Sequence, residues 1–225
     1  MFEYPPHAIF DRVIAKSKLY GYAKPTKAVR DRFVAHVAEI VWLYKLSPET
    51  TNLTATAAVP EFQVFSVRLR EAPIANAVLR DLLLTIDKAV PSPIVHQVVC
   101  GDRVRYAAAY KRPVAGRAAA GVQSVVGAYF DLPWEPTGGP LLPLPVALDL
   151  GGLYEQVLRR HLPYPARVGE GLAEQVERME RIRHLEAECR RLEGGLGKER
   201  QFNRQMELHS ALRRQEAELG GLRAV

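Results

Sequence analysis

A highly charged stretch near the C-terminus, from about Glu170 to Leu219, constrains the fold of this chain more than any other feature. Its charged residues alternate in sign, so it cannot bury itself in a globule and needs a partner surface. Within it, apolar side chains recur at three- and four-residue steps, which is the spacing of a coiled-coil seam. They are Ile182, Leu185, Cys189, Leu192 and Leu196. The sequence therefore predicts a long, coiled-coil-like helical arm.

The second half of this register is polar. It continues through Glu199, Asn203 and Met206, next to Phe202. An amide at a seam position lowers stability but selects register and partner, so Asn203 indicates selective pairing. The alternative is a solvated helix that packs along its own domain. We expect the docking surface of the arm to comprise side chains from both halves: Leu185, Leu192, Leu196, Phe202, Asn203 and Met206.

Three glycines interrupt the middle of the arm. Gly194, Gly195 and Gly197 each cost about 1 kcal/mol relative to alanine in a helix interior. The helix either folds back there as a hairpin or continues through a weak joint, and the strong helix formers on both sides favour continuity. The seam also slips between Leu196 and Phe202, so the two halves need not face the same partner.

Length and composition indicate one folded body in front of the arm. The chain has 225 residues, of which 48% are hydrophobic and 25% charged. We expect an α+β body over residues 1–164 and the helical arm over 165–225. No apolar run is long enough to span a bilayer, and the N-terminus lacks the pattern of a secretory signal, so we expect no membrane contact and a cytoplasmic location. Two cysteines are too few for a disulfide framework.

The body is predicted to contain a small antiparallel or mixed sheet with flanking helices. Helical spacing predicts helices over 8–16, 27–38, 74–90 and 151–162. Runs of β-branched and aromatic residues predict strands over 39–46, 62–69, 94–100, 104–110 and 122–130. The first two helices resemble a helix-turn-helix only loosely, so they give little support to DNA readout.

Motifs for catalysis are incomplete. The glycines around Arg117 lack the context of a phosphate-binding loop, and the histidines are not spaced as zinc ligands, so we expect no cofactor and no metal. One enzymatic alternative is a metal-dependent nuclease, with Asp102 as a metal-binding acid and Lys111 after the next strand. The second acid would stand at Ala109, which cannot bind Mg²⁺. Asp102 is therefore better explained as a hairpin-turn residue and Lys111 as a strand-end charge.

Five short segments, in the same order along most of the chain, resemble one known family. They are WLYKLSPET (42–50), EFQVF (61–65), IDKAVP (86–91), AYK (109–111) and QFNR (201–204). They resemble the bacterial and archaeal domain-of-unknown-function family 4391. That resemblance implies a similar size and a genomic setting near helicases and DNA methyltransferases, in restriction-modification or phage-defence clusters. It implies no reaction, because the family has no established activity.

Together these patterns favour a non-catalytic accessory or scaffolding subunit of a DNA-processing assembly. We expect the arm to dock on a larger partner such as a helicase or methyltransferase. A metal-dependent nuclease, or a degenerate descendant of one, is the first alternative. A basic DNA-binding protein is the second, because the net charge of +6 permits contact with nucleic acid. Self-association of the arm is left open.

Overall fold

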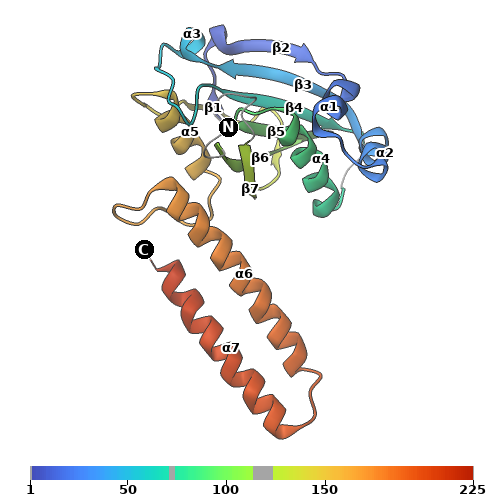
Figure 1. The fold of residues 1–225 in the computed structure, drawn as a ribbon, viewed down its shortest axis with the longest axis vertical. Helices are drawn as coiled ribbons and strands as arrows, with labels where there is room; N and C mark the ends of the chain where they lie inside the picture. Colours follow the sequence, from blue (N-terminus) through green and yellow to red (C-terminus); the bar gives the residue numbers. More distant parts are fainter. Residues whose placement is uncertain (1, 71–73, 114–123, 225) are drawn as a thin grey trace. The chain divides into compact units, whose positions relative to one another are not determined.

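The computed structural model describes residues 2–70, 74–113 and 124–224 (Figure 1). The chain divides into two compact units, Met1–His161 and Leu162–Val225, which we call the first and second units. The sequence placed this boundary after residue 164. Arg117 with its neighbouring glycines, and the first two residues of the strand predicted over 122–130, lie outside the described residues.

A mixed sheet forms the centre of the first unit. Its strands follow one another across the sheet in the order β2 (Ile9–Val13), β3 (Val37–Leu46), β4 (Phe62–Leu69), β5 (Ile94–Cys100), β6 (Arg103–Pro113) and β7 (Ser124–Asp131). A short strand, β8 (Glu135–Pro136), pairs with β6. Neighbouring strands are antiparallel except β4 and β5, which helix α4 (Asn76–Ala89) connects as a parallel crossover. The predicted mixed sheet with flanking helices is confirmed.

Helices cover both faces of this sheet. On one face lie α1 (Lys16–Ala23), α2 (Lys27–His36) and α4, whose apolar side chains join the main core (Figure 1). The other face is covered by α5 (Leu150–Arg159), where the ring of Tyr154 packs 5.8 Å from that of Phe62. The remaining short elements are η1 (Pro6–Ala8), α3 (Pro48–Thr51), and the paired strands β1 (Phe2–Glu3) and β9 (Leu142–Pro143).

The helix predicted over 8–16 is wrong, because this segment forms strand β2. Ile9 pairs with Tyr44 of β3, but the register shifts before Arg12, and Asp11 has a positive φ of 45°. This bulge breaks the alternation of inward and outward side chains, so the apolar residues fall at steps that imitate a helix. The actual helix α1 begins only at Lys16 and was not predicted.

The second unit is a helical hairpin of two long antiparallel helices, α6 (Leu172–Leu196) and α7 (Phe202–Arg223) (Figure 1). The favoured continuous arm is therefore wrong: the chain reverses over 197–201. Glycines weaken the end of α6, and the Glu199 carboxylate accepts hydrogen bonds from the amides of Arg200 (2.9 Å) and Gln201 (3.0 Å), which lie where α7 starts. None of the described helices is long and apolar enough to cross a membrane.

Candidate functional site

The inner faces of α6 and α7 explain why the arm folds back on itself. One stripe of buried and half-buried side chains on α6 follows alternating three- and four-residue steps: Gln175, Arg178, Ile182, Leu185, Cys189, Leu192 and Leu196. Val176 and Met179 are also buried but lie outside this stripe. A stripe on α7 follows the same steps: Gln205, Leu208, Leu212, Gln215, Leu219 and Leu222. The helices meet closely, since a Cβ at Gly195 would lie 3.9 Å from Leu208 Cδ1. Leu185 is fully buried, and Leu192 and Leu196 are half-buried in the same hairpin.

The other three expected docking residues lie at the start of α7, outside this inner face. Phe202 is 71% exposed and Met206 is 55% exposed, one helical turn further along. Asn203 is also exposed. The amides on the inner face of α7 belong instead to Gln205 and Gln215. The structure thus separates the six expected residues into three leucines on the inner face and three side chains at its turn.

Basic charge surrounds these exposed side chains. Hydrogen bonds from the amides of Gln201 and Arg200 lower the pKa of Glu199, so this carboxylate binds the backbone of the turn just before α7. Arg204 pairs with Glu207 at 2.7 Å. Within the described ranges neither Lys198 nor Arg200 has an ion-pair partner. We call the surface formed by Lys198, Arg200, Phe202, Asn203 and Met206 the hairpin tip.

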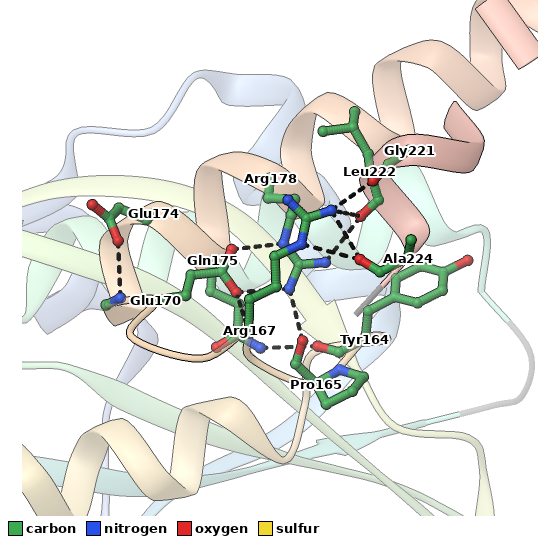
Figure 2. A network of polar contacts seen from close by, with 11 residues as sticks. Tyr164, Pro165, Arg167, Glu170, Glu174, Gln175, Arg178, Gly221, Leu222 and Ala224 are labelled. Carbon is green, nitrogen blue, oxygen red and sulfur yellow. Dashed lines mark hydrogen bonds and ion pairs between the residues drawn. The ribbon is translucent and has the colours of Figure 1, made fainter. Parts of the chain in front are cut away.

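A dense polar network closes the other end of the hairpin (Figure 2). Arg178 lies on α6 and is only 6% exposed. Its Nε and Nη2 donate to the two carboxylate oxygens of Glu170 at 2.6 and 2.8 Å, an arrangement that matches the planar guanidinium. The same side chain donates to the carbonyls of Pro165 (2.7 Å) and Leu222 (3.1 Å). Arg178 therefore joins the loop before α6 to the end of α7.

Arg167 reinforces this closure from the same loop. Figure 2 shows its guanidinium beside the last turn of α7, where it donates to the carbonyls of Gly221 (2.6 Å) and Ala224 (2.9 Å). Carbonyls at a helix C-terminus lack partners within the helix and carry the negative end of its dipole, so guanidinium groups bind them favourably. The hydrogen bonds from Arg178 lower the pKa of Glu170 to about 2, against the opposing effect of burial. This network, the hairpin base, fixes the two helices against each other.

The two residues of the nuclease alternative lie near opposite ends of β6. Asp102 is exposed in the turn before the strand, whereas Lys111 is 3% exposed near its other end. The nine residue steps of extended chain between Asp102 and Lys111 span roughly 30 Å, so the two side chains do not share one site. Lys111 is not a strand-end surface charge: its ammonium pairs with Asp87 at 2.9 Å and donates to the carbonyls of Val90 (2.7 Å) and Ser92 (2.9 Å).

Asp87 is the centre of a buried polar cluster that the sequence reasoning missed. Its Oδ2 lies 2.8 Å from His96 Nε2 and accepts a hydrogen bond from the Tyr129 hydroxyl. Burial alone raises the pKa of Asp87, but His96 and Lys111 outweigh it and hold the value at about 2. The cluster fastens the end of α4 to β5, β6 and β7. The sequence did contain one sign that Asp87 is buried. It follows the buried Leu83 by one helical turn and therefore lies on the same, buried face of α4.

Comparison with known proteins identifies a family but no characterised relative. A family model described as "Domain of unknown function (DUF4391)" matches residues 2–219, which is nearly the whole chain. No curated protein and no solved structure matches the chain significantly. Within the described ranges, His, Cys, Asp and Glu side chains form no group of three or more that is arranged to hold a metal ion.

Proposed function

Because this chain belongs to the DUF4391 family, whose description names no activity, we propose its function from the geometry of the hairpin. The protein acts as a non-catalytic accessory subunit that docks on a larger protein through the hairpin tip. The folded body and the hairpin form separate compact units, which is the arrangement of a module that carries its own binding arm.

The exposure of Phe202 and Met206 carries this proposal. They are the two most exposed large apolar side chains of α6 and α7, where the opposite helix covers the leucines. Burying one such side chain contributes about 1.5–3 kcal/mol. Aromatic side chains that insert into a partner's pocket, surrounded by polar groups, dominate many protein interfaces. Phe202 is therefore the proposed anchor and Met206 its neighbour.

The charges of the tip indicate the kind of surface that receives it. Lys198 and Arg200 lack ion-pair partners within the described ranges, and between them stands the single carboxylate of Glu199, so the tip carries an excess of one positive charge. We propose an apolar recess with acidic side chains at its rim on the partner protein, because complementary rim charges accelerate encounter and reject wrong partners. That this partner is a helicase or methyltransferase stays a prediction from the family's genomic setting.

We further propose that the hairpin is an antiparallel coiled coil. The alternating steps on both inner faces support this, as does the length of its helices, 25 and 22 residues. Such pairing holds the tip in one shape before it binds, which lowers the entropy cost of docking. The inner-face leucines then support the tip and do not contact the partner.

Replacing Phe202 by alanine is expected to weaken docking by about 1–4 kcal/mol, because the partner's recess loses its anchor. The test first compares proteins that co-purify with wild type, Phe202→Ala and Val168→Ala from native cells. Val168 is a matched control, since it is an exposed apolar residue of the same unit outside the tip. A protein lost only with Phe202→Ala is then purified, and its affinity for each variant is measured by calorimetry. Equal affinity for all three chains would exclude the tip as the docking surface.

A chain that ends at His161 is expected to remain folded, because the first unit contains its own hydrophobic core. Urea unfolding should show one cooperative transition, while association with the partner is lost. If the shortened chain has no cooperative transition, the hairpin contributes to the fold of the body. In that case it is not a separate docking arm.

A further inference from the structure

A pocket of about 360 Å³ lies in the first unit, on the sheet face opposite α4. Its floor includes Gln97 and Tyr106, which pair across β5 and β6. Their chain neighbours His96 and Ala107 belong to the opposite, α4-covered face, since successive strand residues alternate. The volume is within the range of small-molecule sites, roughly 300–1,000 Å³.

Aromatic side chains form much of the wall of this pocket. Phe2 and Tyr4 come from the N-terminal segment, Tyr44 from β3 and Tyr106 from β6. The rings of Tyr4 and Tyr44 are in contact, with centroids 4.8 Å apart. We call this cavity the tyrosine pocket. The faces of aromatic rings attract cations, so a wall with four aromatic residues favours a cationic ligand.

The charge of the pocket is opposite to that of the chain. Although the protein carries a net charge of +6, the described residues that line the pocket include no lysine, arginine or histidine. They do include Glu135 of β8, which has no ion-pair partner within the described ranges. Burial raises the pKa of Tyr106, and the charge of Glu135 raises it further, so this carboxylate acts on the pocket wall.

Tyr4 of the pocket wall carries a buried hydroxyl. It is 8% exposed, and within the described part of the chain its buried hydroxyl has no hydrogen-bond partner. A buried hydroxyl without a partner is unfavourable by about 1–3 kcal/mol, so proteins rarely keep one without a reason. Because this hydroxyl is itself shielded from solvent, a bound molecule meets other atoms of Tyr4 in the pocket wall.

We propose that the tyrosine pocket binds a quaternary or methylated ammonium group, held by cation–π contacts with its rings and by the charge of Glu135. Alkylation makes the cation large and weakly hydrated, so aromatic walls can replace its water at little cost. The group can come from a small molecule such as choline or from a methylated lysine of another protein. This inference is independent of the proposed docking function, since the pocket and the hairpin tip belong to different units.

The charge of the ligand is the first thing to test. Calorimetry of the full chain with choline and with its neutral isostere 3,3-dimethylbutan-1-ol compares two ligands of the same shape. Choline is expected to bind at least about tenfold more tightly, because only the cation gains from the rings and the carboxylate. A peptide with trimethyllysine, measured beside choline, distinguishes the two sources of the group. Equal binding of choline and its isostere, or no binding of either cation, would overturn the proposal.

Variants then locate the site. Glu135→Gln is expected to weaken choline binding about tenfold and leave the isostere unchanged, and it should fold normally because Glu135 is exposed. Glu3→Gln is the matched control, since Glu3 is exposed and does not line the pocket. Tyr44→Phe should retain binding and Tyr44→Leu should lose most of it. If Glu135→Gln and Glu3→Gln bind choline equally, the carboxylate has no role and the inference is wrong.

Discussion

Replacing Lys111 by methionine is expected to lower the free energy of unfolding of the first unit by about 3–5 kcal/mol. The physical reason is that Asp87, 1% exposed, remains charged in the core without the ammonium 2.9 Å away. The carbonyls of Val90 and Ser92 lose a donor at the same time. Urea unfolding at neutral pH measures the loss as a shift of the transition midpoint.

Two further variants separate this pair from an ordinary ion pair. Asp87→Asn together with Lys111→Met should recover part of the loss, because neither partner is then left as an isolated buried charge. Lys45→Met is the matched control on β3: Lys45 pairs with Glu61 at 3.0 Å but both side chains are about one-third exposed, so about 0–1 kcal/mol is expected. A similar loss from both lysine variants would contradict the special role of the buried pair.

The pH dependence of the same cluster has a definite sign. An unfolded aspartate titrates near pH 4, whereas the pKa of Asp87 in the folded chain is about 2. The folded state therefore prefers the ionised carboxylate, and this contribution to stability is present above about pH 4. It is lost as the pH falls through 4 towards 2. Asp87→Asn should flatten that part of the stability profile.

Replacing Arg178 by alanine is expected to destabilise the hairpin by about 3–5 kcal/mol, the second largest effect that we predict. The change removes the bidentate partner of the Glu170 carboxylate and the donor to the Pro165 carbonyl at the hairpin base. Arg167 still donates to Glu170 (2.9 Å) and to the Leu222 carbonyl (3.2 Å), but its backbone amide does not replace the lost guanidinium charge beside Glu170. Hydrogen exchange of the α7 amides in the full chain measures the loss directly, because it reports opening of this helix separately from the body.

The chain contains a good control for Arg178. Arg181 lies three residues further along α6 and pairs with Glu218 of α7 at 2.6 Å, but both side chains are nearly half exposed. Arg181→Ala should therefore cost only about 0–1 kcal/mol. The loss of stability in Arg178→Lys should lie between those of the two alanine variants, since lysine keeps the charge but lacks the planar guanidinium that binds both carboxylate oxygens. Equal protection of α7 in the two alanine variants would show that the base network does not hold the hairpin.

The sequence was most informative where one local pattern decides the structure. The strands over 62–69 and 94–100 have the predicted bounds, because their β-branched residues end sharply at turns. The hairpin was considered but a continuous helix was favoured, because strong helix formers flank the three glycines and the seam was extended from α6 through Glu199 and Asn203 despite its slip after Leu196. The steps of α7 begin afresh at Gln205, and that new register was the available sign of a separate helix.

The buried cluster and the tyrosine pocket could not be predicted in this way. Asp87 and Lys111 become partners only because the crossover through α4 and the register of β6 bring them together. Similarly, Tyr4 and Tyr106 are about a hundred residues apart and meet through sheet packing. Neither pair shares a helix face or a strand, so no local periodicity records the contact.

The fold-back of the hairpin sets an order of events during synthesis. The apolar stripe of α6 leaves the ribosome first and has no cover until the stripe of α7, from Gln205 to Leu222, follows it. At common rates of synthesis this delay is roughly 1–5 s. During this delay α7 does not cover Ile182 and Leu185, so these side chains can contact other nascent chains. Fragments that end before Phe202 leave this apolar stripe permanently uncovered, so they are expected to aggregate and to be degraded rapidly in cells.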